Sequence, residues 1–232
     1  MSTVTRTQRN ALAETILAAL HDRDAVSALD ALERVLGTTG AVSIDTADAA
    51  RLRARGLVAD AVPGDAPSVV VLAQAFDPVR AAARDRVARG RRASDVYWTA
   101  SDAAEIAPAE ARDGVDEADL AATWRRAVAL FDARLYFEVH EELEELWRRS
   151  TGVTRAVVQG VLQVAVALHH AEAGNVAGAR RLLAAGRAKL VPHAPRWRTV
   201  AIAPLLAELR RWEHARLELG ELEVAPPRLA RE

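Results

Sequence analysis

The sequence contains no cysteine, a single methionine and few aromatic residues, which make up 4% of its 232 residues. The lack of cysteine excludes disulfide bonds, thiolate metal sites and cysteine nucleophiles. Neither sign of charge is in excess, because the formal net charge is -1 at pH 7. No overall electrostatic field therefore draws the protein toward nucleic acid or a membrane, and binding of either kind would have to be local.

Long apolar runs are also missing. The most apolar stretch, residues 157–167, is interrupted by Gln159 and Gln163. It is much shorter than the roughly 20 apolar residues that a membrane-spanning helix needs. Residues 1–10 lack the apolar core of a signal peptide. We therefore expect a cytoplasmic protein without a membrane partner.

The residues that are present are typical of a helical globular protein. Half of them are apolar and 27% are charged. Alanine and arginine are abundant and β-branched runs are few, which favours helix. We expect a mainly α fold, in which a C-terminal helical bundle follows a small N-terminal helical domain with room for one β-hairpin.

Turn residues and prolines suggest the domain boundaries. The expected parts are an N-terminal domain over 1–92, a linker over 93–116 that includes Pro108 and Asp113-Gly114, a bundle over 117–217 and a loose tail over 218–232. Apolar residues at helical spacing predict the helices of the bundle at roughly 117–132, 135–149, 154–172, 176–190 and 201–217. Gly160 and Gly178, inside two of these helices, suggest that helices approach each other closely there.

The N-terminal domain has the outline of a winged helix, because helix, turn, helix and a hairpin at 57–72 follow one another over residues 26–72. Arg51, Arg53 and Arg55 would lie on the second helix, where a protein that reads the DNA major groove needs cations. A solvated arginine face on an ordinary small domain explains the same pattern, and we favour it. The arginines between residues 84 and 92 are interpreted in the same way.

Polar chemistry is densest between residues 136 and 148. At 100° per residue, a core-facing stripe is formed by Tyr136, Val139, Leu143, Leu146 and Trp147. His140 and Glu144, one turn apart, fall on the edge of this stripe, and Arg148 is placed to pair with Glu144. The glutamates expected to point toward solvent are Glu138, Glu142 and Glu145.

The following helix is apolar nearly all round, with three exceptions on one stripe. These are Gln159, Gln163 and His170, at positions i, i+4 and i+11. Long polar side chains on a buried helix must find partners, since an unpaired buried polar group costs about 1–3 kcal/mol. His140 and Glu144 on the preceding helix offer them. We predict that the two stripes face each other and enclose a polar pocket.

The same residues carry a resemblance to a known family. The pattern is Tyr136-Phe137-Glu138-x-His140-Glu141-x-Leu143-Glu144-x-x-Trp147-Arg148, then Gln159-Gly160-x-x-Gln163, then His170 and Gly174-Asn175-x-x-Gly178-Ala179. It is similar to the helical family catalogued as domain of unknown function 309. The resemblance covers about residues 117–190 and implies a compact helical bundle, with no established activity. The turn Asp132-Ala133-Arg134 departs from the pattern, because relatives often have glycine there.

Three interpretations of the polar cluster stay open. It can be a structural network that fixes helix packing, a site for a small polar ligand or acid–base chemistry, or a divalent metal site at His140, Glu144 and His170. Glutamine is a poor ligand for such metals, and no second histidine lies at i+3 or i+4 from His140. We therefore predict no metal and no other cofactor, and keep the metal as an alternative.

We expect a helical-bundle protein with a polar pocket. Its candidate catalytic residues are His140, Glu144 and His170. Its candidate ligand-binding residues are Tyr136, Gln159, Gln163 and Trp147, although Trp147 also suits a core anchor. The alternatives are a structural or partner-binding module and a regulator with an N-terminal DNA-binding part. The sequence is compatible with self-association and does not decide whether the protein is an enzyme.

Overall fold

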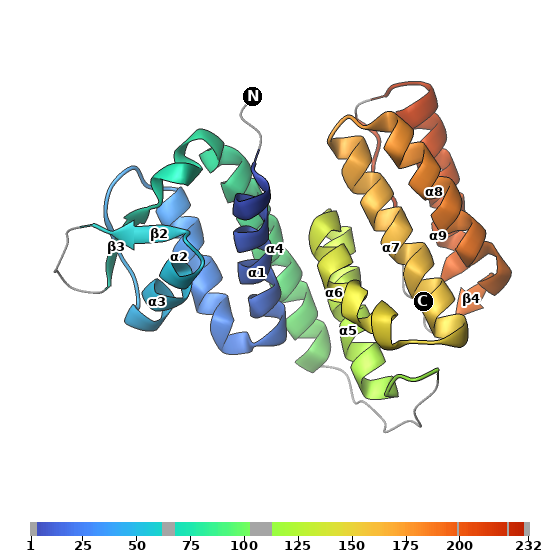
Figure 1. The fold of residues 1–232 in the computed structure, drawn as a ribbon, viewed down its shortest axis with the longest axis horizontal. Helices are drawn as coiled ribbons and strands as arrows, with labels where there is room; N and C mark the ends of the chain where they lie inside the picture. The colour runs from blue at the N-terminus through green and yellow to red at the C-terminus, as the bar shows by residue number, and fades with distance from the viewer. Residues whose placement is uncertain (1–3, 62–67, 103–112, 199, 222, 230–232) are drawn as a thin grey trace. The chain divides into compact units, whose positions relative to one another are not determined.

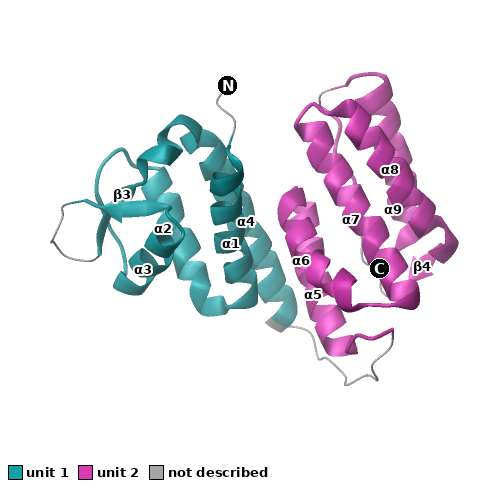
Figure 2. Ribbon diagram, in the orientation of Figure 1, with its two compact units in different colours: residues 1–103 teal, residues 104–232 magenta. Residues whose placement is uncertain are grey.

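A computed structural model describes residues 4–61, 68–102, 113–198, 200–221 and 223–229. The chain divides into two compact units, residues 1–103 and residues 104–232 (Figure 2). Most described residues are helical, which confirms the predicted mainly α fold (Figure 1).

Unit 1 combines four helices with a small sheet. The helices are α1 (Arg6–His21), α2 (Val26–Leu36), α3 (Thr46–Ala54) and α4 (Arg80–Asp102). The strands β1 (Val42–Ser43), β2 (Val58–Asp60) and β3 (Val69–Leu72) form an antiparallel sheet in the order β1-β3-β2. The predicted hairpin is thus β2 and β3, and the sequence missed the third strand.

Local sequence signals explain where two helices of unit 1 begin. Thr5 and Gln8 form a reciprocal capping box at α1, and the side chain of Asp45 caps α3. Helix α4 continues to Asp102, so residues 93–102 of the expected linker are helical. Residues 103–112, which include Pro108, lie outside the described residues.

Unit 2 is an array of helices joined by short turns. Its helices are α5 (Glu117–Asp132), α6 (Tyr136–Arg149), α7 (Gly152–Glu172), α8 (Val176–Leu190) and α9 (Ile202–Trp212), the last continued by a π-helical turn (Glu213–Glu218) (Figure 1). Helix α6 packs between α5 and α7, and α7 packs between α6 and α8. A short hairpin of β4 (Arg196–Trp197) and β5 (Val200–Ala201) lies between α8 and α9 and was not predicted.

The C-terminal tail is attached to unit 2 rather than loose. The backbone N–H of Arg228 donates to Glu208 at 2.7 Å, and that of Leu229 donates to Asp132 at 3.0 Å. Leu229 is only 1% exposed. The prediction of a loose tail is therefore wrong for these residues, because one apolar side chain and two backbone donors find partners on α5 and α9.

Helix α7 is the central helix of unit 2. Its most apolar window has a mean hydropathy of 1.2, so by length and composition this helix could cross a membrane. In the structure 56% of that window is buried, with α6 and α8 as its neighbours. This is the environment of a core helix in a bundle.

Two glycines bring the backbones of α7 and α8 into contact. A Cβ added at Gly186 would lie 2.8 Å from the carbonyl oxygen of Gly160, and one added at Gly160 would lie 3.2 Å from the carbonyl oxygen of Gly186. The close approach predicted at Gly160 is therefore present. Gly178 has another role, since a Cβ there would meet the side chain of the helix cap Asn175 at 2.6 Å.

Replacing Gly186 with alanine should destabilise unit 2 by about 1–3 kcal/mol, the usual cost of an overpacked core. The added methyl group meets a main-chain oxygen that cannot move away by changing a rotamer. Urea unfolding measures the change. The control is Gly40→Ala, where no atom lies within 4 Å of the new Cβ. Equal stability of the two variants would contradict a tight α7–α8 contact.

The side chain of Asp113 hydrogen-bonds to the first turn of α7. Its carboxylate accepts hydrogen bonds from the backbone N–H of Thr154 at 3.1 Å and from the Thr154 hydroxyl at 2.9 Å. Both hydrogen bonds lower the pKa of Asp113 below its ordinary value, and the one from the backbone N–H has the larger effect. The positive charge of Arg198 lowers it by a smaller amount. The folded state therefore favours the ionised carboxylate.

Because this pKa is lowered on folding, the stabilisation is present above the ordinary pKa of an aspartate and is lost as the pH falls through the folded-state value. Asp113→Asn should lower Tm at neutral pH. The difference from the unmodified protein should close as the pH falls below the lowered folded-state pKa of Asp113. Thermal unfolding across pH tests this, with the exposed Asp85→Asn as control. A difference that stays constant down to acidic pH would contradict the role of the charge.

Candidate functional site

The polar edges of α6 and α7 lie along one half-buried strip, which we call the seam. Its members are Phe137, His140, Glu144 and Trp147 from α6 and Arg155, Gln159, Gln163, Val166 and His170 from α7. All of them are partly exposed. The seam forms because both helices turn their fully apolar sides toward the core, which leaves the polar edges at the rim of the contact.

Contacts near the two ends of the seam fix how α6 and α7 pair. The guanidinium of Arg155 lies over the Trp147 ring, 4.3 Å from its centroid. At the other end, the ring centroids of Phe137 and His169 are 6.3 Å apart. The two helices run antiparallel. Counting residues inward from these two contacts therefore places Glu144 opposite Gln159 and His140 opposite Gln163.

The two predicted stripes are therefore neighbours, but they do not enclose a buried space. The His140 side chain is 35% exposed and that of Glu144 is 33% exposed. Gln159, Gln163 and His170 are half-buried as well. The seam is an open strip, and the prediction that these side chains are buried is corrected.

Arg155 crosses the seam and donates to the carbonyl oxygen of Trp147 on α6 at 2.7 Å, whereas His140, Glu144 and His170 bond to side chains on their own helix or in the turn that follows it. His140 Nδ1 lies 3.1 Å from Glu141 Oε1. Arg148 donates to Glu144 at 2.6 Å, as the spacing predicted. His170 Nδ1 lies 3.0 Å from Asn175 Nδ2 in the turn after α7. Gln163 Oε1 is buried without a hydrogen-bond partner among the described residues.

Of the predicted ligand-binding aromatic residues, Tyr136 lies outside the seam and Trp147 lies within it. Tyr136 is 3% exposed and packs edge-to-face on Phe131, with ring centroids 5.5 Å apart. It belongs to the contact with α5. Trp147 is half-buried with Arg155 over its ring, so it is not the core anchor that the sequence also suggested.

A possible metal-ligand set does exist on α6, with a different third member from the predicted one. One ligand atom each of His140, Glu141 and Glu144 lies within 4.8 Å of the others. In place of His170, Glu141 completes this set. Glu141 was not among the site residues predicted from the sequence.

Two glutamates of α6 are buried, on the side of the helix that faces away from the seam. Arg126 Nε donates to Glu142 Oε1 at 2.6 Å, and Arg126 Nη2 donates to Thr123 Oγ1 at 3.1 Å. Glu138 is 1% and Glu142 is 7% exposed. The prediction that these two glutamates point toward solvent is wrong, because α6 is covered by α5 on one side and by α7 on the other.

A signal for this buried cluster was present in the sequence. Thr123 and Arg126 interrupt an apolar stripe on α5 that includes Trp124, Ala127 and Leu130. A cation inside such a stripe needs an anion on the adjacent helix. Glu138 and Glu142, one turn apart on α6, were the available anions.

The arginines of α3 are held by partners inside unit 1. Arg51 lies 3.1 Å from Asp48 and Arg53 lies 2.5 Å from Asp60. Arg55 donates to the carbonyl oxygen of Arg51 at 3.1 Å. These contacts favour the interpretation of a solvated structural face over a reader of the DNA groove.

Comparisons with known proteins support the resemblance inside unit 2. Residues 124–182 match the family model described as a domain of unknown function, DUF309. The uncharacterized protein YpuF of Bacillus subtilis (strain 168) is 48% identical over 52 residues, which are 22% of this chain and 30% of that protein. No solved structure matches the chain. The matched segment contains the seam and the Arg126–Glu142 pair.

Removing one member of the buried pair should be costly. Arg126→Met leaves the Glu142 carboxylate without its cation and should cost about 3–5 kcal/mol in unfolding free energy. Arg126→Met combined with Glu142→Leu should cost less than the sum of the single changes, since both single changes remove the same interaction. Urea unfolding of the four proteins measures this.

The matched control is Arg148→Met, which removes the exposed pair with Glu144 and should cost about 1 kcal/mol or less. If Arg126→Met is no more destabilising than this control, the buried pair does not stabilise the α5–α6 contact.

Proposed function

We propose that unit 2 is a helical module that binds a divalent cation at His140, Glu141 and Glu144, and through it a small polar ligand along the seam. The observation that carries the proposal is the convergence of one imidazole nitrogen and two carboxylate oxygens within 4.8 Å. Ligands of one ion are separated by distances of this order, so a small rotamer change would bring all three onto a single cation.

The donor set fits a borderline transition metal such as Zn²⁺ or Mn²⁺. One nitrogen and two carboxylate oxygens are common ligands for both ions. Because the three side chains are partly or fully exposed, water can complete the coordination, and the remaining positions are open to a ligand. Glu144 would have to exchange its bond to Arg148 for one to the ion.

The second wall of the seam has complementary groups. Gln159 and Gln163 lie at the levels of Glu144 and His140, and the amide oxygen of Gln163 has no partner among the described residues. Amides rarely bind these ions directly, but they hydrogen-bond well to bound water or to a polar ligand. In this division of roles His140, Glu141 and Glu144 are the ligands of the ion, and the two glutamines position the bound water or the polar ligand.

One observation also favours metal-free acid–base chemistry at the same residues. Glu141 lies 3.1 Å from Nδ1 of His140, and a carboxylate at that nitrogen orients the ring and leaves Nε2 to exchange a proton. The two functions are separated by metal titration, since only the first requires an ion.

Calorimetric titration of the full chain with Zn²⁺ and Mn²⁺ should show one site per chain for at least one of the two ions. His140→Ala and Glu144→Gln should each weaken the affinity about tenfold or more, because each removes a ligand of the ion. Circular dichroism of the variants checks that the helices remain intact.

The chain offers two matched controls. Glu145 is adjacent to Glu144 and shares Arg148 with it, but it is outside the cluster, so Glu145→Gln should bind normally. His214 lies 2.7 Å from Glu218 on another helix, and His214→Ala should also bind normally. Absence of a stoichiometric site, or equal losses in the Glu144 and Glu145 variants, would reject the cation site.

A further inference from the structure

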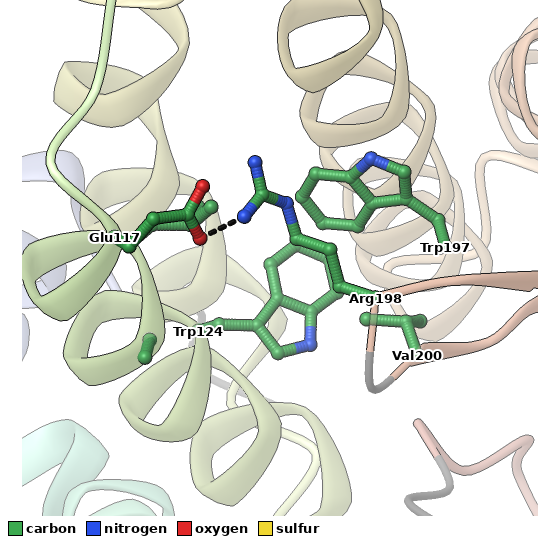
Figure 3. Close-up of a pocket in the computed structure, with 7 residues that line it drawn as sticks. Glu117, Trp124, Trp197, Arg198 and Val200 are labelled. Carbon is green, nitrogen blue, oxygen red and sulfur yellow. Dashed lines mark hydrogen bonds and ion pairs between the residues drawn. The ribbon is translucent and has the colours of Figure 1, made fainter. Parts of the chain in front are cut away.

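A second candidate site lies in unit 2, apart from the seam. A cavity of about 130 Å³ separates the start of α5 from the β4–β5 hairpin. Its walls include Glu117, Leu120, Ala121 and Trp124 from α5 and Trp197 and Arg198 from the hairpin (Figure 3). None of these residues belongs to the seam, so the cavity is independent of the proposed cation site.

An ion pair forms the polar end of the cavity. The guanidinium of Arg198 donates to Glu117 Oε2, and in Figure 3 it lies between that carboxylate and the ring of Trp197. Its Cζ atom is 5.1 Å from the centroid of this ring. The backbone of Arg198 is left-handed, with φ at 53°, a strained conformation for a side-chain-bearing residue. The structure thus holds Arg198 in place at a backbone cost.

The second oxygen of Glu117 is the unusual feature. Glu117 Oε1 is buried and has no hydrogen-bond partner among the described residues. A buried acceptor on a charged group is costly to leave unpaired. The cavity beside it is the place from which a donor can reach this oxygen.

The rest of the cavity is apolar and aromatic. Trp124 and Trp197 meet edge-to-face with ring centroids 5.6 Å apart, and they are 5% and 9% exposed. A volume of about 130 Å³ approaches that of cavities that hold a single benzene ring. Water could bond to Glu117 Oε1, but an ordered water needs two to four polar partners, and these walls offer few.

We propose that this cavity binds a small neutral molecule of about one aromatic ring that carries a single O–H or N–H donor. The donor bonds to Glu117 Oε1 and the ring packs against Trp124, Trp197 and Leu120. A cation fits less well for two reasons. Arg198 already compensates the charge of Glu117, and it already occupies the face of Trp197 where a cation would bind.

Phenol is the probe, added to the full chain and followed by the indole N–H signals in a nitrogen–proton NMR spectrum. Saturable shifts are expected for Trp124 and Trp197, assigned with single Trp→Phe variants, and not for Trp98 in unit 1. Toluene has the same ring without a donor and should bind about tenfold more weakly, as expected for the loss of a hydrogen bond to a charged group. Benzylamine, the cationic comparison, should also bind more weakly than phenol.

A cavity-filling variant tests the location without touching the charges. Ala121→Leu places a larger side chain on the cavity wall and should abolish phenol binding. Ala184→Leu adds the same side chain to an exposed position of α8 and should leave binding unchanged.

Four results would overturn the proposal. They are no saturable shift with phenol, equal affinity for phenol and toluene, tighter binding of benzylamine than of phenol, and unchanged binding in Ala121→Leu. Tighter binding of benzylamine would identify a cation that displaces Arg198 instead. None of these results bears on metal binding at His140, so the two proposals fail or stand separately.

Discussion

The ion pair between Arg126 and Glu142 sets the rotation of α6, on which the arrangement of unit 2 depends. A guanidinium and a carboxylate bonded at 2.6 Å in a buried environment tolerate little rotation, because any turn of the helix would break a charge-assisted hydrogen bond out of reach of water. With Glu142 directed at α5, helical geometry places His140 and Glu144 on the edge next to α7. The buried pair and the exposed seam are thus two consequences of one orientation.

The sequence predicted the elements whose signals are local and missed those that arise from tertiary packing. Helices α5 to α8 follow from apolar spacing and from caps such as Asn175, and the β2–β3 hairpin follows from its turn residues. The β4–β5 hairpin has only two residues per strand, too few to show an alternating pattern. The attachment of Leu229 depends on acceptors on α5 and α9 that lie far away in the sequence.

For the candidate site, the helical spacing placed the polar residues on the correct edges of α6 and α7, but it gave the wrong burial for several of them. It placed His140 and Glu144 beside the glutamine stripe, and the pairing of Trp147 with Arg155 agrees with that placement. It could not show that α6 has a second covered side, because a wheel describes one helix and carries no information on the number of its neighbours. For that reason Glu138 and Glu142 were assigned to solvent. The Glu117–Arg198 contact joins α5 to the unpredicted hairpin, so no local pattern could have indicated it.

Gly160 and Gly186 allow the main chains of α7 and α8 to come into close contact. Side chains can take up a displacement by changing rotamer, whereas helical backbones in direct contact cannot. We therefore expect α7 and α8 to move as one rigid body. If unit 2 adjusts its shape to a ligand, the adjustment falls to the β4–β5 hairpin, which carries Trp197 and Arg198 of the second candidate site.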